Sequence, residues 1–364
     1  MNIFFRVDAS VTIGTGHVIR CLTLAMVLRE QGAKVTFICR ELTGNLCDQI
    51  ESKGFYVHRL PWLENKESSS VETEKYSHWL GVSWQEDSEQ TNAILVRNSA
   101  MIDWLIVDHY SLDYLWQKSK RSVVRRIMVL DDLANRRHDC DLLLDQNPYF
   151  DMETRYDGLV PSGCTMLLGL HFALLKPEFQ KARSRITDRS GKVKRILVFF
   201  GGSDIDNSTL RILNILKEVC NHTIFIDVVI GVNNSNVNQI MSATEGIKNI
   251  KCHINISNME EIFLDVDLYI GAAGITTWER CCLGVPGLVV CISENQIKPI
   301  EYLADLGATY YIGEISKTED ADFIRSIKCL LNSPDLLKRY SEKSLALVDG
   351  KGSDRCARAL FGKK

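Results

Sequence analysis

The residues best suited to chemistry lie between Asp8 and Arg20, where the chain reads D-A-S-V-T-I-G-T-G-H-V-I-R. An apolar run precedes this stretch and an amphipathic run follows it, so we expect a strand, a loop and a helix. Gly14 and Gly16 allow a tight turn and a close approach by a ligand. His17 and Arg20 place a titratable ring and a cation at a helix start, where unpaired N–H groups attract anions. The stretch therefore predicts an anion-binding site with a base beside it.

The same stretch also fits a plain strand-to-helix turn in which His17 is only a polar residue at the helix start. The segment G-T-G-H lacks the third glycine of a dinucleotide-binding fingerprint, so it does not indicate NAD.

Two further glycine-bearing loops follow apolar runs in the second half of the chain, at residues 201–204 and 271–274. Each is expected to place backbone amides beside a helix start, which suits a diphosphate. Glu279, expected in the first turn of the helix after the second loop, could accept hydrogen bonds from the two hydroxyls of a ribose. Tight turns and a favourable acid at a helix start are the alternatives. Together the loops favour a nucleotide diphosphate ligand, bound by Gly201, Gly202, Ser203, Gly274, Thr276 and Glu279.

Polar clusters also follow other strands. Asp108-His109-Tyr110 is expected near His17, and Glu294-Asn295-Gln296 begins a helix in the second half. We interpret His109 and Asp131 as loop caps.

Composition limits the classes of partner. The 364 residues are 45% hydrophobic and 24% charged, and their net charge of -3 gives no reason to expect a nucleic acid or an anionic membrane. The twelve cysteines contain no C-x-x-C pair, and no signal peptide or membrane-spanning run is evident. A cytoplasmic protein with reduced thiols is expected. No cluster of histidines and carboxylates suggests a metal, and no cofactor is expected.

Strand and helix signals alternate along the chain, which predicts parallel sheets covered on both faces. The fold class is α/β, with two doubly wound Rossmann-like domains and a cleft between them. The expected domains are residues 1–176 and, for the nucleotide, residues 194–364, joined by a polar, basic linker at 177–193. The expected strands lie at residues 3–6, 35–39, 55–59, 104–107, 127–130, 142–144, 195–200, 224–230, 250–254, 268–270 and 287–292.

Residues 62–100 interrupt this alternation with a run of serines and acidic residues and with Trp79 and Trp84. We interpret them as a surface insertion with some helix. The insertion could carry a surface for a protein partner, although a decorated crossover helix is the simpler interpretation.

The ordered motifs R-V-D-A-S-V-T-I-G-T-G-H-V-I-R-C, D-H-Y, G-G-S-D, G-A-A-G-I-T-T-W-E and E-N-Q resemble those of the nucleotide-sugar hydrolases of pseudaminic acid biosynthesis. That family removes UDP from UDP-2,4-diacetamido-2,4,6-trideoxy-β-L-altropyranose and is similar in fold to the GT-B glycosyltransferases. The resemblance covers roughly residues 1–60 and 101–310. The insertion and the tail after residue 313 depart from the compact members.

The resemblance implies a role for each matching residue. His17 would be the catalytic base that activates water, and attack opposite UDP would invert the anomeric carbon. Tyr110 and Asn295 would act with His17 as catalytic residues, because they would line the sugar site and orient substrate or water. The first domain would thus bind the sugar and carry the catalysis. Helix starts would stabilise the leaving UDP without a metal. The remaining substrate-binding residues would be Asp8, Gly14, Gly16, Arg20, Gly201, Gly202, Ser203, Ile256 (at the uracil), Gly274, Thr276, Glu279 and Gln296.

Two alternatives stay open at this point. A glycosyltransferase of the same fold would use an acceptor hydroxyl instead of water. A non-catalytic nucleotide-sugar binding protein would keep its function when His17 is replaced.

Overall fold

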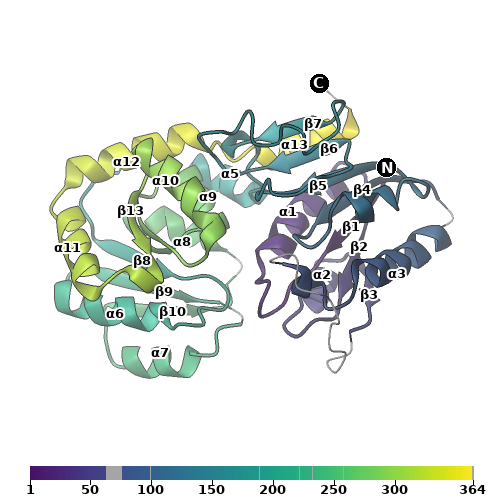
Figure 1. Cartoon of the computed structure of the whole chain (residues 1–364). Coiled ribbons are helices and arrows are strands. Elements are labelled where there is room, and N and C mark those ends of the chain that lie inside the picture. Colours follow the sequence, from purple (N-terminus) through teal and green to yellow (C-terminus); the bar gives the residue numbers. More distant parts are fainter. Residues whose placement is uncertain are drawn as a thin grey trace. The chain divides into compact units, whose positions relative to one another are not determined.

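The computed structural model describes residues 1–62, 76–98, 100–187, 189–220, 222–231, 233–256 and 258–362. The chain divides into two compact units, each built on one parallel sheet (Figure 1). Unit 1 comprises residues 1–147, 151–174 and 352–364, and unit 2 comprises residues 148–150 and 175–351. Of the expected insertion at 62–100, residues 63–75 and 99 lie outside the described part of the chain.

Unit 1 contains a seven-stranded sheet of order β3-β2-β1-β4-β5-β6-β7, in which every neighbouring pair is parallel. The chain therefore builds outward from β1 in one direction and resumes with β4 in the other. The strands are β1 (Asn2–Val7), β2 (Lys34–Arg40), β3 (Tyr56–Leu60), β4 (Ile102–Asp108), β5 (Val124–Leu130), β6 (Leu142–Asp145) and β7 (Thr165–Leu168).

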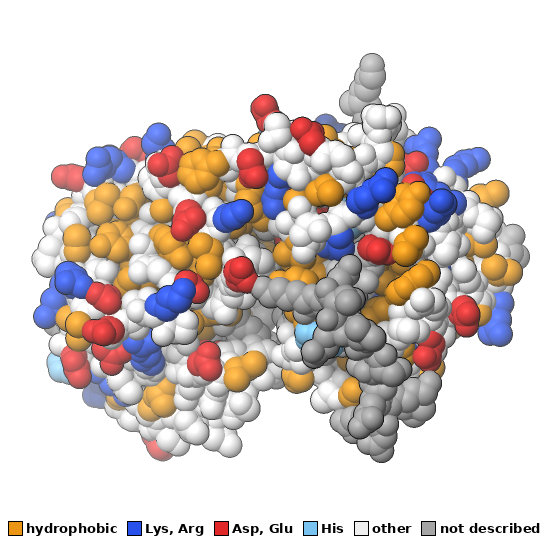
Figure 2. Space-filling model, in the orientation of Figure 1, with side chains coloured by type: hydrophobic (Ala, Val, Ile, Leu, Met, Phe, Trp, Pro, Cys, Tyr) orange, Lys and Arg blue, Asp and Glu red, His pale blue; other side chains and the backbone are white. Residues whose placement is uncertain are grey.

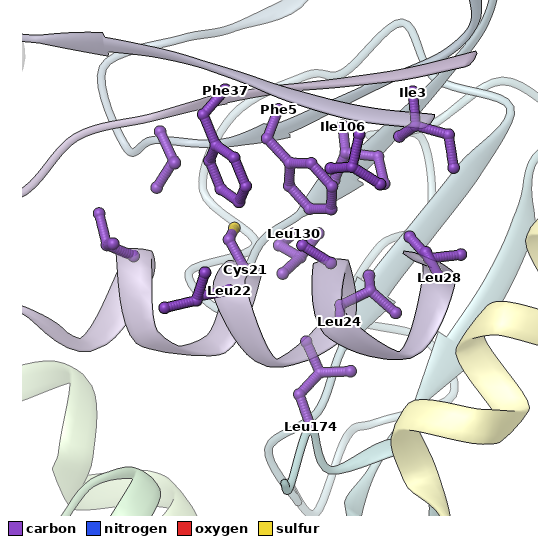
Figure 3. Close-up of a cluster of buried hydrophobic side chains, with 14 of the residues drawn as sticks. Ile3, Phe5, Cys21, Leu22, Leu24, Leu28, Phe37, Ile106, Leu130 and Leu174 are labelled. Carbon is purple, nitrogen blue, oxygen red and sulfur yellow. The ribbon is translucent and has the colours of Figure 1, made fainter. Parts of the chain in front are cut away.

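Alternate residues of these strands enter two separate cores, because successive side chains of a strand point to opposite faces. Phe5 and Phe37 lie in the core beneath α1, and their rings stack with centroids 4.9 Å apart (Figure 3). Phe4 and Ile38 enter the core on the other face. The helices of unit 1 are α1 (Gly16–Glu30), α2 (Cys47–Ser52), η1 (Ser77–Leu80), α3 (Trp84–Arg97), α4 (Tyr114–Lys118), η2 (Leu170–Phe172) and α13 (Gly352–Phe361).

Unit 2 repeats the design with a six-stranded parallel sheet of order β10-β9-β8-β11-β12-β13. Its strands are β8 (Arg195–Phe199), β9 (Phe225–Ile230), β10 (Ile250–Ile254), β11 (Leu268–Ala272), β12 (Gly287–Cys291) and β13 (Tyr310–Glu314). Its helices are α5 (Pro177–Arg183), α6 (Ser208–Val219), α7 (Val237–Thr244), α8 (Met259–Asp265), α9 (Ile275–Cys282), η3 (Glu294–Gln296), α10 (Ile297–Asp305), η4 (Ile315–Lys317), α11 (Asp320–Leu331) and α12 (Pro334–Leu347).

The predicted strands are all present, and the sheets also contain two strands that were not predicted. These are β7 and β13, the last strands at one edge of each sheet. Both have residues that are only partly buried, so their apolar signal is weaker than that of the central strands.

The region expected to be a linker, 177–193, begins instead with helix α5. Pro177 occupies the first turn, where its missing N–H is no loss. Phe179 and Ala182 are buried. The guanidinium of Arg183 donates to the carbonyl oxygens of Cys282, Leu345 and Val348, so α5 is an integral part of unit 2.

The end of the chain also differs from the expected boundaries, because α13 belongs to unit 1 and not to the nucleotide domain at 194–364. Cys356, Ala357 and Leu360 are buried in the same core as α1. The indole of Trp104 donates a hydrogen bond of 3.0 Å to the carbonyl oxygen of Leu360. A Cβ on Gly352 would come within 2.2 Å of the Ala173 carbonyl oxygen, so the helix approaches its neighbour closely.

Figure 2 shows acidic and basic side chains interspersed over the face in view. Among the described residues, no helix combines the length and the apolar character needed to cross a membrane.

The packing of α13 predicts a unit-specific loss of stability. Leu360→Ala should lower the free energy of unfolding of unit 1 by about 2–5 kcal/mol, because it leaves a cavity in a packed core. Hydrogen exchange followed by mass spectrometry should then quicken in β1 and α1. The matched control is Leu330→Ala, a fully buried leucine of α11, which should quicken exchange in unit 2 instead. Faster exchange in β8 and α6 after Leu360→Ala would contradict the assignment of α13 to unit 1.

Candidate active site

The candidate catalytic residues of unit 1 lie where its strand order reverses. β1 and β4 are neighbours although β2 and β3 separate them along the chain. The loop after β1 leads to His17, and Asp108 is the last residue of β4. In open parallel sheets, ligands bind outside the carboxyl ends of the strands at such a switch point. The topology therefore brings the predicted His17 to the position where a ligand is expected.

Gly14 and Gly16 shape the approach to α1. Gly14 adopts φ of 80° and donates its N–H to the carbonyl oxygen of Ser10, which closes a tight turn. Gly16 is the first residue of α1, and Thr15, at the N-cap, makes no side-chain cap. The start of α1 is thus formed by backbone amides, as the sequence predicts.

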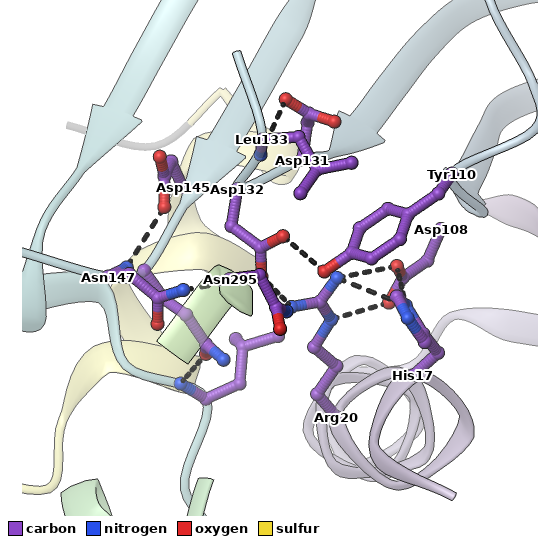
Figure 4. A network of polar contacts seen from close by, with 12 residues as sticks. His17, Arg20, Asp108, Tyr110, Asp131, Asp132, Leu133, Asp145, Asn147 and Asn295 are labelled. Carbon is purple, nitrogen blue, oxygen red and sulfur yellow. Dashed lines mark hydrogen bonds and ion pairs between the residues drawn. The ribbon is translucent and has the colours of Figure 1, made fainter. Parts of the chain in front are cut away.

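His17 is held by a buried carboxylate. Its Nδ1 lies 2.6 Å from Oδ1 of Asp108, and the His17 residue is 8% exposed (Figure 4). An ionised carboxylate only accepts hydrogen bonds, so this contact favours the tautomer with the proton on Nδ1. The lone pair then resides on Nε2, which is the arrangement a general base requires.

The charge of Arg20 is paired with carboxylates of the protein, whereas the sequence predicted a cation that faces an anionic ligand. Its guanidinium donates to both carboxylate oxygens of Asp108, each at 2.6 Å, and to Asp132 at 3.0 Å (Figure 4). Arg20, followed by His17, lowers the pKa of the Asp108 carboxyl against the effect of its burial. The pKa of Arg20 is raised by the same two carboxylates. Arg20 therefore keeps Asp108 ionised.

Tyr110 contacts His17 through its ring. The two rings meet edge to face with centroids 4.7 Å apart. The Tyr110 hydroxyl donates to Oδ1 of Asp132, and the residue is only 4% exposed. Burial and the charge of Asp132 raise the pKa of Tyr110 well above its usual value. The Tyr110 ring thus packs against His17, whereas Tyr110 was expected to line a sugar site.

Asp8 is placed in the core and not at a ligand. The residue is fully buried, and its carboxylate accepts from Arg6 Nη1 and from the backbone N–H of Arg40, each at 2.6 Å. Its other oxygen lies 3.4 Å from Nε2 of His109. These contacts lower the pKa of Asp8, with Arg6 the main cause. The expectation that Asp8 binds substrate is therefore not supported by its surroundings.

The two glycine loops of unit 2 lie at the corresponding switch point. β8 and β11 are neighbours, and the loops at 201–204 and 273–274 follow them. A Cβ on Gly271 would come within 1.9 Å of the Phe199 carbonyl oxygen, so only glycine lets these strands approach. A Cβ on Gly231 would likewise lie 2.4 Å from Cα of Gly202. Gly201 adopts φ of 92° before Ser203 and the turn to α6.

The first loop was expected to leave backbone amides free at the start of α6, but these amides are already hydrogen-bonded. Asp204 accepts from the backbone N–H groups of Ser208 at 2.8 Å and Thr209 at 3.0 Å. An acidic side chain thus occupies the amides that a phosphate would use, and its charge would repel one. Gly201, Gly202 and Ser203 remain close to the switch point, but the helix they precede is already capped.

The start of α9 is different, because its N-cap residue has no side chain. Gly274 adopts φ of 137° and supplies no cap to the amides of Ile275 and Thr276. A Cβ on Gly274 would lie 3.9 Å from Nε2 of Gln296, so the structure brings two predicted segments together. Oε1 of Gln296 accepts a hydrogen bond of 2.9 Å from the backbone N–H of Ile292. Of these two helix starts, that of α9 is the better candidate for an anion site.

Glu279 lies one position beyond the first turn of α9, not within it as expected. Its side chain is partly buried. Burial raises the pKa of Glu279 to about 7, and the charge of Lys176 opposes this shift. A carboxyl with such a pKa changes its charge near neutral pH.

The other predicted residues of unit 2 occupy separate positions. Asn295 is in η3, where its Oδ1 accepts from the Ser293 hydroxyl at 2.7 Å. Ile256 follows β10, which two strands separate from β11. Within the described ranges, no group of three or more His, Cys, Asp or Glu side chains could hold a metal ion.

Three residues that contact the site were not predicted as site residues. Asp108 belongs to the cluster expected near His17, and Asp132 is the second residue after β5. Both are carboxylates at strand ends, and this position could have marked them as it marked Tyr110. Trp79 lies in the predicted insertion, and its ring meets His17 edge to face at 6.2 Å. No periodicity or motif marks Trp79.

Comparison with known proteins supports the fold and the resemblance. Residues 196–351 match the Glycosyltransferase family 28 C-terminal domain. The chain is 28% identical over 309 residues to the UDP-2,4-diacetamido-2,4,6-trideoxy-beta-L-altropyranose hydrolase of Campylobacter jejuni, covering 84% of this chain and 97% of that protein. It is 23% identical to the spore coat polysaccharide biosynthesis protein SpsG of Bacillus subtilis, covering 99% and 98% of the two chains.

Among solved structures, MurG of Acinetobacter baumannii superposes with a TM-score of 0.67 at 14% identity, covering 99% of both chains. The α/β fold class with two Rossmann-like units, as in the GT-B proteins, is thereby confirmed. The resemblance to the UDP-sugar hydrolases is confirmed as a similarity of sequence.

The buried carboxylate of Asp108 predicts an acid-sensitive contribution to stability. Its folded-state pKa is lowered, so the contribution is complete above the usual aspartate value of about 3.9 and is lost progressively below it. Asp108→Asn should lower the free energy of unfolding by about 3–5 kcal/mol at pH 7, because Arg20 loses its buried partner. Urea denaturation from pH 7 to pH 3 should show this difference shrinking below pH 4.

The control is Asp157→Asn, which alters an exposed carboxylate of the same unit. It should stay within about 0.5 kcal/mol of the unaltered protein at each pH. A deficit for Asp108→Asn that is constant from pH 7 to pH 3 would show that the charge of Asp108 is not what stabilises the fold.

Proposed function

We propose that this protein hydrolyses a UDP-linked sugar, releasing UDP and the free sugar. The observation that carries the proposal is the His17–Asp108 pair, a polarised imidazole at the switch point of unit 1. Sequence similarity to a UDP-sugar hydrolase over 84% of the chain supports the same reaction class.

His17 acts as the general base in this proposal. Nε2 accepts a proton from water while the water oxygen attacks the anomeric carbon, and the bond from that carbon to the diphosphate oxygen breaks. Asp108 holds the ring by Nδ1 and stabilises the imidazolium that forms. Arg20 keeps Asp108 ionised throughout. Attack on the face opposite UDP inverts the anomeric carbon.

In this proposal, unit 2 binds the nucleotide. The uncapped start of α9, at Gly274 and Thr276, would accept the negative charge that develops on the departing diphosphate. Glu279, farther along the same helix, would accept hydrogen bonds from the ribose hydroxyls. Ile256 would meet the uracil, and Asn295 and Gln296 would meet the sugar end. The proposed reaction uses no metal, so turnover should persist in excess EDTA.

The proposed sugar is a 2,4-diacetamido-2,4,6-trideoxy hexose, which places the reaction in pseudaminic acid biosynthesis. The support for this finer assignment is the activity for which the Campylobacter jejuni relative is named. Glycosyl transfer to an acceptor is the second candidate, because residues 196–351 match a glycosyltransferase domain. An acceptor requirement distinguishes the two.

The first test follows UDP release and the anomeric NMR signal with UDP-2,4-diacetamido-2,4,6-trideoxy-β-L-altropyranose and no acceptor. We expect release with inversion. His17→Ala should lower kcat by about 10²–10⁴-fold, because the base is lost, and leave the affinity for UDP unchanged. His171→Ala, which removes an exposed histidine of unit 1, should keep full turnover.

Three outcomes would count against this proposal. Full turnover by the His17→Ala variant would remove His17 from the mechanism. Substrate that binds but stays intact until an acceptor is added would favour the glycosyltransferase. A sugar nucleotide that does not bind would reject the proposed sugar.

The raised pKa of Glu279 predicts pH-dependent nucleotide binding. If the ribose requires the carboxylate, UDP affinity should rise about tenfold from pH 6 to pH 8, as the fraction ionised grows through a pKa of about 7. Calorimetry on the unaltered protein and on Glu279→Gln measures this. The phosphate of UDP also titrates, but it does so equally with both proteins. The informative quantity is therefore the difference between the two proteins in how UDP affinity changes with pH. Equal slopes would argue against Glu279 as the ribose ligand.

A further inference from the structure

Trp79 brings an aromatic side chain from η1 to the face of the candidate base. Its ring stacks on Tyr110 with centroids 5.4 Å apart and an interplanar angle of 23°. It also meets His17 edge to face at 6.2 Å. Trp79 is partly exposed, whereas Tyr110 is buried. The indole is therefore the part of this aromatic stack that a ligand at His17 can contact.

The position of Trp79 is fixed by its neighbours in the described part of the chain. The Tyr76 ring lies 4.8 Å from that of Trp79 and 5.1 Å from that of Tyr110. The Ser111 hydroxyl donates to the Tyr76 carbonyl oxygen at 2.5 Å, which ties this segment to the loop after β4. Leu80, at the end of η1, is buried in the core of unit 1. Trp79 is thus held in place before any ligand arrives.

The ring face of the Trp79 indole is an apolar surface, because the only polar group of this side chain is the Nε1–H at the ring edge. The hydroxyl of Tyr110 is already committed to Asp132. A sugar hydroxyl pressed against this surface would lose its water without a replacement hydrogen bond. A methyl group or the C–H face of a sugar would instead gain apolar contact with the indole.

We propose that Trp79 is a specificity-determining residue that receives a methyl-bearing substituent of the sugar. The substrate class it selects is a 6-deoxy nucleotide sugar, whose C6 is a methyl group, in preference to one with a hydroxyl at C6. This inference rests on the proposed function, because it places the sugar beside His17. Trp79, a residue of the expected insertion, then has a role in substrate choice.

The test compares two UDP-sugars that differ at C6, one 6-deoxy and one with a 6-hydroxyl, both carrying acetamido groups. For Trp79→Ala, kcat/KM for the 6-deoxy sugar should fall at least tenfold, mostly through KM, and the preference over the 6-hydroxyl sugar should shrink by a similar factor. Trp79→Phe should keep most of the preference. Trp84→Ala, which removes another tryptophan of the insertion, should keep it fully.

A purely structural role for Trp79 gives a different result. If the indole only supports His17, Trp79→Ala lowers kcat equally for both sugars, and the unchanged preference overturns the proposal. An unchanged KM for the 6-deoxy sugar also overturns it.

Calorimetry separates this inference from the hydrolase itself. If the unaltered protein releases no UDP, the proposed function fails, but affinities can still be compared. The unaltered protein should then bind the 6-deoxy UDP-sugar more tightly than UDP. In Trp79→Ala this gain in affinity should be at least tenfold smaller, and the affinity for UDP should be unchanged. No such gain in the unaltered protein, or an equal gain in both, overturns the role of Trp79.

Discussion

The buried carboxylate of Asp108 is the constraint on which the candidate active site depends. This carboxylate positions His17 and accepts hydrogen bonds from Nε and Nη2 of Arg20. A buried charge is tolerated only when it is paired and hydrogen-bonded, so each of these three side chains requires the others. Asp132 extends the cluster to Tyr110. The orientation of the base is therefore set by the same interactions that allow the core of unit 1 to contain charges.

Two helix starts in unit 2 illustrate how similar loops acquire different capacities. Both follow central strands, and both are preceded by loops that contain glycine. Asp204 accepts hydrogen bonds from the first amides of α6, whereas Gly274 leaves those of α9 without a side-chain cap. One carboxylate a few residues away therefore decides whether the amides of a helix start are open to an anion.

The parallel sheets and the place of His17 at the start of α1 follow from patterns visible in the sequence. Central parallel strands are apolar on both faces, so their runs are continuous and were predicted. The pairing of Arg20 with Asp108, and the hydrogen bond from the Arg40 backbone to Asp8, could not be predicted, because these partners are far apart in the sequence and meet only through packing. Trp79 gave no periodic signal. The edge strands β7 and β13 were missed because partial burial weakens the apolar pattern.

Helix α13 has a consequence for how the chain folds during synthesis. The residues of unit 2 emerge from the ribosome before α13 and can close their own core without it. Unit 1 emerges first, yet the apolar surface of α1 that packs against Cys356, Ala357 and Leu360 stays uncovered until those residues appear. The half of the protein that is made first is thus the half that finishes folding last. Its exposed surface during that interval is a natural binding site for chaperones.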